Sequence, residues 1–176
     1  MNTVQPISLA DKAKQEYEQG NYSTAAEMFS QAAKAYSASK DELNAAEMKN
    51  NQSVALLQAG KAREAFQATD GTEAIFEQAG DLKRQGVAVS NRAAALEGLK
   101  KWKEALAEYD RAASLLEQAG EGDMHSMVRK SAANLNLKLG RMTDSQMDVL
   151  DSIRLAEKPT LAQRILKFLI RIGILR

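Results

Sequence analysis

Few side chains in this sequence could carry out chemistry, and the clearest candidate is a histidine. The chain of 176 residues contains one histidine, His125, and no cysteine. His125 lies two residues after Asp123 at the start of an expected helix, so we expect it to be exposed to solvent. A metal site or an acid–base pair would need convergent partners, and no other histidine or cysteine can supply them. We therefore predict that the protein is not an enzyme and has no metal and no cofactor.

The charge distribution predicts a mildly acidic body and a basic tail. The chain has 24 basic and 23 acidic residues. From Pro159 onward there are four bases and no acid, which leaves 20 bases against 23 acids for the rest. Affinity for phosphates comes from clustered Lys and Arg, so we expect no binding to nucleic acid. Residues 1–9 lack the basic start and the apolar segment of a signal peptide, which predicts a cytoplasmic protein.

The elements that must position the polar side chains repeat every 40 residues, four times. Gly20, Gly60, Lys100 and Gly140 begin equivalent turns. A period of a few tens of residues is typical of proteins in which each unit buries its apolar face against its neighbours. Small residues recur where helices should approach most closely: Ala13, Ser53, Ala93 and Ala133 in one column, and Ala25, Ala65, Ala105 and Ser145 in the other.

Each repeat reads as two helices joined by a short turn. The predicted first helices are residues 9–19, 41–59, 81–99 and 123–139, and the predicted second helices are 23–37, 62–78, 102–118 and 143–157. Gly60 and Gly80 are expected to end helices in the left-handed conformation, and Asp81 is expected to cap the next helix. Ala62 and Thr69 are small for their columns, which predicts looser packing in the second repeat, whereas Trp102 and Tyr109 are expected in the core.

The helix pair, the small residue at mid-helix and the Gly-x-aromatic-x-x-Ala turn resemble the tetratricopeptide repeat (TPR). The period is similar to that of the longer, 40-residue variety in kinesin light chains and bacterial scaffold proteins. The resemblance implies an all-α, right-handed α-solenoid of four repeats: residues 9–40, 41–80, 81–120 and 121–157. Residues 1–8 are expected to be a flexible N-terminus, and residues 158–176 a basic amphipathic helix that caps the solenoid.

The resemblance also implies a concave groove, lined by the first helices, that binds a peptide or a partner's helix. Asn51 and Asn91 occupy equivalent positions, and an asparagine amide can pair with any peptide backbone. The alternative is that these asparagines only cap or solvate their helices. The residues that the resemblance places on this face are Asn50, Asn51, Val54, Leu57, Gln58, Asn91, Ala94, Glu97, Lys130, Ser131, Asn134 and Lys138.

Lys130 and Asn134 lie one turn apart and resemble half of the clamp by which chaperone-binding members hold a peptide C-terminus. The equivalent pairs in the other repeats do not complete the clamp. These pairs are Ala10 and Lys14, Asn50 and Val54, and Ser90 and Ala94. We therefore do not expect binding to chaperone tails.

The tail is predicted to form a helix over residues 161–172, with Thr160 and Gln163 as a capping box and Gly173 as its stop. Its large apolar side chains cover more than half of the helix circumference, and one neighbouring helix can cover only part of this surface. We expect it to pack on the helices that end near Leu139 and Leu155. The remaining apolar residues, Leu166, Leu169 and Ile170, are expected to contact a second copy, a partner or a membrane surface. At about 18 Å the helix is too short to span a bilayer.

Together these features predict a non-enzymatic adaptor or scaffold that binds a protein or peptide in the concave groove. The alternative is a membrane-surface or complex-assembly factor anchored by its basic, apolar C-terminal helix. The expected partners are a protein or peptide, with a possible homodimer or a weak membrane contact through the tail.

Overall fold

The computed structural model describes residues 6–156 and 160–171, and every regular element in these ranges is an α-helix. The expectation of an all-α protein is confirmed for this part of the chain. The helices are α1 (Pro6–Glu18), α2 (Tyr22–Ala38), α3 (Glu42–Gln58), α4 (Ala62–Ala68), α5 (Thr72–Gln78), α6 (Leu82–Gly98), α7 (Trp102–Gln118), α8 (Gly122–Lys138), α9 (Met142–Arg154) and α10 (Leu161–Arg171).

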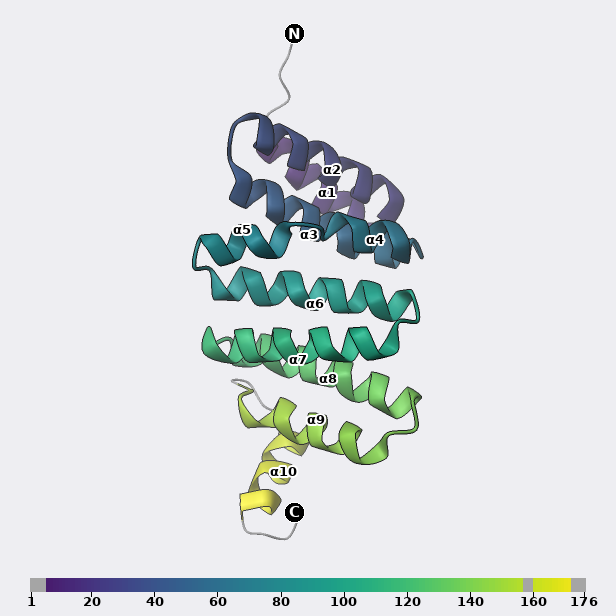
Figure 1. The fold of residues 1–176 in the computed structure, drawn as a ribbon, viewed down its shortest axis with the longest axis vertical. Coiled ribbons are helices and arrows are strands. Elements are labelled where there is room, and N and C mark those ends of the chain that lie inside the picture. Colours follow the sequence, from purple (N-terminus) through teal and green to yellow (C-terminus); the bar gives the residue numbers. More distant parts are fainter. Residues whose placement is uncertain (1–5, 157–159, 172–176) are drawn as a thin grey trace.

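The helices are stacked in chain order along the long axis, with α1 and α2 at one end and α10 at the other (Figure 1). Apart from α4 and α5, successive helices pack against each other in helix-turn-helix fashion, and the first helices α3 and α6 also touch. Most helix ends lie within two residues of the predicted positions. The largest differences at a terminus are of three residues: α1 begins at Pro6, within the segment expected to be flexible, and α9 ends at Arg154 instead of residue 157.

The turns between the helices share one backbone conformation, which recurs every 20 residues. At each of these positions φ is positive, as expected for the left-handed end of a helix: Gly20, Lys40, Gly60, Gly80, Lys100, Gly120 and Gly140. At the end of α6 the Lys101 amide donates to the Leu96 carbonyl and the Lys100 amide to the Glu97 carbonyl, both at 2.9 Å. This is the Schellman arrangement, which satisfies the last carbonyls of the helix.

A lysine in this conformation is strained, because its Cβ lies too close to the following carbonyl oxygen. Lys100 has a φ of 61°. We expect Lys100→Gly to raise the free energy of unfolding by about 0.5–1 kcal/mol, since the relief of strain exceeds the extra chain entropy of glycine. Urea denaturation followed by circular dichroism measures this. The control is Lys101→Gly, where φ is −87°, which should give no gain. Equal effects at both positions would argue against strain at Lys100.

The small residues at equivalent positions of the repeats lie where the helices pack against each other. Seven of these eight residues are at most 3% exposed, and Ser145 is 8% exposed. Their burial confirms the predicted packing role. Larger side chains fill the space around them. Phe29 and Leu56 lie in the N-terminal core cluster, and Tyr109, Leu116 and Leu135 lie in the C-terminal one. Trp102 is half-buried against the second cluster.

The predicted continuous helix 62–78 is wrong, because the chain breaks between α4 and α5. Gly71 has a φ of 75°, a conformation that interrupts a right-handed helix. The Thr69 hydroxyl donates to the Phe66 carbonyl at 2.7 Å, and the Thr72 hydroxyl donates to the Thr69 carbonyl at 2.9 Å. Each of these carbonyls also accepts a backbone amide three residues on, so the threonine hydroxyls add a second donor at the break. The sequence Asp70-Gly71 is an ordinary turn signal that the repeat pattern had masked.

The C-terminal helix α10 begins with the predicted capping box. The Gln163 amide donates to Thr160 Oγ1 at 3.3 Å, and the Thr160 amide donates to Gln163 Oε1 at 2.7 Å. α10 contacts α9, as expected for a helix that follows the last repeat. Leu166 is half-buried. The side chains of Leu169 and Ile170, and the predicted stop at Gly173, lie outside the described part of the structure.

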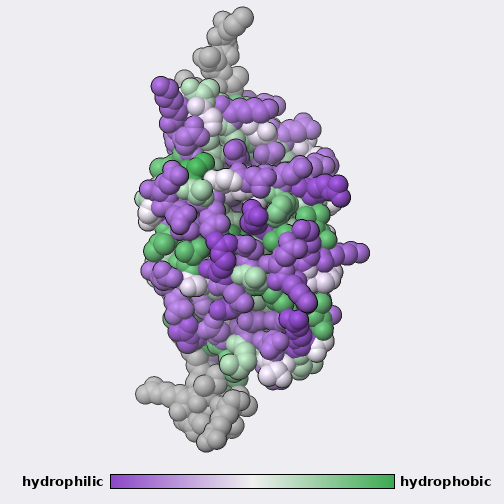
Figure 2. All heavy atoms as spheres, in the orientation of Figure 1, coloured by the Kyte–Doolittle hydropathy of each residue, from purple (hydrophilic) through white to green (hydrophobic). Residues whose placement is uncertain are grey.

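The face in Figure 2 is largely hydrophilic, and its hydrophobic side chains form small, separate patches. Among the described helices, none is both long and apolar enough to cross a membrane.

Candidate functional site

An open cavity of about 490 Å³ lies among three first helices, α3, α6 and α8. Its apolar side chains come from α5, α6 and the first turn of α8, and its polar ones come mainly from α3 and α6. The lining residues are Glu47, Asn50, Asn51, Phe76, Asp81, Lys83, Arg84, Val87 and Met124. Cavities of this size and mixed lining are typical of ligand sites in proteins.

A second, smaller cavity of about 190 Å³ adjoins the first at Asn51. It lies among α1, α2 and α3 and is lined by Lys14, Tyr17, Glu18, Phe29, Asn51 and Val54. Because Asn51 lines both cavities, they follow one another along the first-helix side of the stack. The two together are called the groove below.

Asn50 is the polar side chain of the groove that combines burial with an unpaired oxygen. It is only 4% exposed, and its Oδ1 has no hydrogen-bond partner among the described residues. A buried amide oxygen without a donor costs about 1–3 kcal/mol. Asn50 also lines the 490 Å³ cavity. Oδ1 itself is shielded from solvent, so a donor on a ligand in the cavity would reach it only after the side-chain amide turns toward the cavity.

Arg84 holds together another part of the groove lining. Its Nε lies 2.6 Å from Asp81 Oδ2 and its Nη1 3.7 Å from Glu47 Oε2, and its guanidinium sits 5.2 Å from the centre of the Phe76 ring. Asp81 caps α6 as predicted, accepting the Arg84 amide at 2.9 Å. This backbone bond, together with the guanidinium, lowers the pKa of Asp81 below its usual value. Charges of both signs therefore border the apolar surface of Phe76.

Only three of the predicted binding residues line the groove: Asn50, Asn51 and Val54. The others do not line either cavity. Glu97 accepts hydrogen bonds from the Tyr109 hydroxyl at 3.1 Å and from Lys138 Nζ at 2.7 Å, so this trio joins α6, α7 and α8. Leu57 packs on the N-terminal core, Asn91 is half-buried, and Lys130 and Asn134 are exposed on α8. The cavity reaches α8 only at its first turn, so these α8 residues lie too far along the helix.

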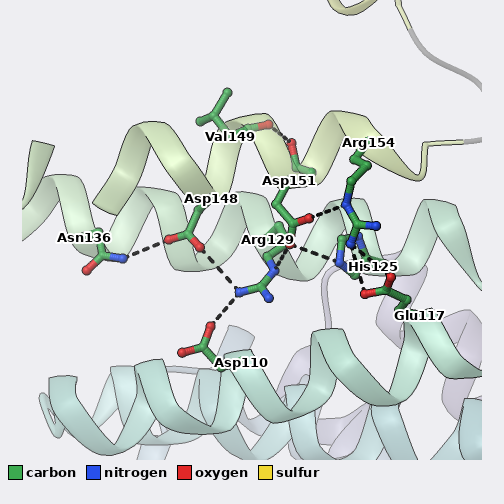
Figure 3. Close-up of polar contacts among 10 residues, drawn as sticks. Asp110, Glu117, His125, Arg129, Asn136, Asp148, Val149, Asp151 and Arg154 are labelled. Carbon is green, nitrogen blue, oxygen red and sulfur yellow. Dashed lines mark hydrogen bonds and ion pairs between the residues drawn. The ribbon is translucent and has the colours of Figure 1, made fainter. Parts of the chain in front are cut away.

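A second cluster of polar side chains lies between α8 and α9, and it includes the histidine. The expectation that His125 is solvated is wrong, because its side chain is fully buried. Its Nε2 lies 3.4 Å from Asp151 Oδ2 on α9 (Figure 3). The signal that the sequence offered was spacing: His125, Val128, Ala132 and Leu135 share one face of the helix, and that face is buried.

Arg129 is the centre of this cluster, and it contacts a carboxylate on each side (Figure 3). Its Nη1 lies 2.5 Å from Asp110 Oδ1 on α7 and 3.5 Å from Asp148 Oδ1 on α9, and its Nε lies 2.6 Å from Asp151 Oδ2. Asn136 Nδ2 donates to Asp148 Oδ2 at 2.8 Å. His125, Arg129, Asn136, Asp148 and Asp151 are called the α8/α9 polar cluster.

The charges and the burial of this cluster indicate that it holds helices together. Burial raises the pKa of Asp148. Burial also acts to raise the pKa of Asp151, but the hydrogen bond from Arg154 and the charge of Arg129 bring it below its usual value. Because His125 is fully buried, no substrate can reach it. No group of three His, Cys, Asp or Glu side chains among the described residues is placed to hold a metal ion. The cluster therefore joins α7, α8 and α9.

The stability of the protein is expected to fall as the pH drops below about 6.5, because His125 takes up a proton in the unfolded chain more readily than in its buried place in the folded one. Burial lowers the pKa of His125; the guanidinium groups of Arg129 and Arg154 act in the same direction, and Asp151 and Glu117 oppose it. A lowered folded-state pKa means that the full stability is present above the unfolded pKa of 6.5 and is lost below it.

The loss is at most about 1.4 kcal/mol for each pH unit. Urea denaturation at pH 7, 6 and 5 measures the effect. His125→Leu is the comparison, since His125 is the only histidine in the chain. The variant should lose most of this slope, and an unchanged slope would show that other groups control it.

The chain matches no protein-family model and no curated protein. The groove and the α8/α9 polar cluster must therefore be interpreted from their own geometry.

Proposed function

We propose that the protein is a non-enzymatic adaptor, built as a four-repeat solenoid of the tetratricopeptide type, that binds an extended peptide segment of a partner in the groove. The arrangement of the helices supports this proposal. The first helices α3, α6 and α8 border one cavity, and α1 and α3 border the next. A segment lying across several first helices would contact both cavities.

The observation that carries the proposal is the buried, unpaired Oδ1 of Asn50 in the larger cavity. An extended peptide presents a backbone N–H at every residue except proline, and one of these can donate to Asn50 once its side-chain amide turns toward the cavity. The neighbouring amide of Asn51 offers both a donor and an acceptor at the junction of the two cavities. Main-chain pairing of this kind gives affinity without demanding one sequence.

The rest of the lining would select the side chains of the peptide. Val87 and Met124 offer apolar contact in the larger cavity, where the buried Phe76 ring lies behind them, and Tyr17 and Val54 offer it in the smaller one. Glu47, Asp81, Lys83 and Arg84 provide both charges at the rim. We expect preferred peptides to place an apolar side chain between polar ones.

The test is a selection of random displayed peptides on the full-length chain, followed by fluorescence anisotropy with the synthetic peptides obtained. Changing Asn50 and Asn51 together to alanine should weaken binding by about 2 kcal/mol, or roughly thirtyfold, because two backbone hydrogen bonds are lost. The matched control is Asn134→Ala, an exposed asparagine on α8 outside both cavities. Equal weakening by the control, or none by the double variant, would count against the groove.

If Asn50 serves binding and not folding, it should make the unliganded protein less stable than a variant without it. We expect Asn50→Ala to raise the free energy of unfolding by about 1 kcal/mol. The change removes an unpaired buried oxygen, and alanine is the better helix former. Thermal denaturation of the unliganded protein measures this. A clear loss of stability would instead assign Asn50 a structural role.

A further inference from the structure

The helix α10 presents an apolar stripe to solvent. Leu161, Ile165 and Phe168 are 74%, 53% and 59% exposed. At about 100° per residue their spacing places them within roughly 60° of each other on the helix surface. Leu166, on another side of the helix, is half-buried. The stripe therefore points away from the described contact with α9.

The charged residues of α10 all have one sign and lie beside this stripe. The sequence Leu161–Arg171 contains Arg164, Lys167 and Arg171 and no acid. Helical spacing places these three positions in one arc, centred about 90° from the stripe. Arg164 is exposed. An apolar stripe with bases along one side is typical of a helix that lies in a membrane interface, where long basic side chains reach the headgroups.

We propose that α10 binds the surface of an anionic lipid membrane, with Leu161, Ile165 and Phe168 inserted among the acyl chains and the bases at headgroup level. The helix has 11 residues and is about 16 Å long, so it lies in the interface rather than across it. This contact is independent of the groove. It would place the groove near a membrane while leaving it open to a partner.

Two observations favour lipid over a second copy of the chain. A stable protein interface buries about 800 Å² on each partner, and a stripe of three side chains offers far less. A second α10 would also bring another set of bases and no acid to pair with them. Anionic headgroups supply the missing negative charge.

The expected binding is weak, reversible and sensitive to salt. Each base near an anionic surface contributes about a fivefold gain in affinity, and the gain falls off within a Debye length. Neutral vesicles should therefore bind the protein much less than anionic ones. Added salt should release it.

The experiment is vesicle sedimentation of the full-length chain with phosphatidylcholine alone and with phosphatidylcholine containing phosphatidylserine. We expect sedimentation with the anionic vesicles only. Ile165→Ser with Phe168→Ser should reduce it at least tenfold. The matched control is Ile7→Ser with Met127→Ser, two residues that are similarly exposed on α1 and α8. Arg164→Gln should reduce binding about fivefold, and Arg63→Gln on α4 should leave it unchanged.

All of these side chains are exposed, so the variants should keep the circular dichroism spectrum of the parent chain, and that spectrum is recorded for each. Light scattering in the absence of lipid tests for a second copy. A dimer that is lost in the Ile165→Ser, Phe168→Ser variant would overturn the proposal. So would a parent chain that does not sediment with anionic vesicles, or equal binding by the stripe variant and its control.

Discussion

Replacing Phe76 with alanine is expected to destabilise the protein by about 3–5 kcal/mol. Phe76 is the largest fully buried side chain, and it packs with Ala46 of α3 and Ala88 of α6. It lies on α5, which has only seven residues and cannot persist without tertiary contacts. Removing the ring would leave a cavity at the point that holds α5 between α3 and α6.

Urea denaturation gives the free-energy change, and amide hydrogen exchange shows whether α5 opens first. The control is Phe66→Ala on α4, where the ring is half-buried beneath the Arg92 guanidinium, 4.7 Å from its centre. That change should cost less than half as much. Phe76 is buried behind the wall of the groove, so Phe76→Ala should also weaken peptide binding by loosening that wall. If Phe76→Ala cost no more than Phe66→Ala, α5 would have to be held by other contacts.

Replacing Arg129 with leucine is expected to cost about 2–4 kcal/mol at pH 7. The Arg129 side chain is 19% exposed and contacts Asp110, Asp148 and Asp151. Without it, Asp148 and Asp151 face each other on α9 without their shared cation. Leaving buried charges unpaired costs far more than an exposed ion pair contributes.

The diagnostic for this cause is rescue by a second change. Asp148→Asn removes one of the carboxylates and should recover part of the loss in the Arg129→Leu background, while costing stability by itself. A double-mutant cycle from four denaturation curves measures the coupling. The control is Arg111→Leu on α7, which also bridges two carboxylates, Glu73 and Glu108, but is half exposed. It should cost less than about 1 kcal/mol. Additive effects of the two cluster changes would exclude charge repulsion as the cause.

The local features of the fold could be predicted from the sequence because each depends on a few adjacent residues. A left-handed turn, a capping box and an N-cap are made by one to four residues whose side chains or φ angles suffice for the hydrogen bonds. Gly80, Asp81 and the pair Thr160 and Gln163 all adopt the predicted conformations. The burial of the small residues that recur at equivalent positions of the repeats could also be predicted. A close contact between helices excludes larger side chains, so small ones recur with the period of the repeat.

What only the tertiary structure decided is which side chains meet. Asn51 and Asn91 are equivalent in the repeat, yet only Asn51 lines the groove, because its neighbours there come from α1, α2, α5, α6 and α8. His125 is buried and Arg129 is partly buried because α9 covers that face of α8, a contact that no short stretch of sequence encodes. The break at Gly71 was signalled locally, but the repeat pattern pointed to a continuous helix. Local hydrogen bonding follows residue type within a turn, whereas the partners of a side chain follow from how all the helices pack.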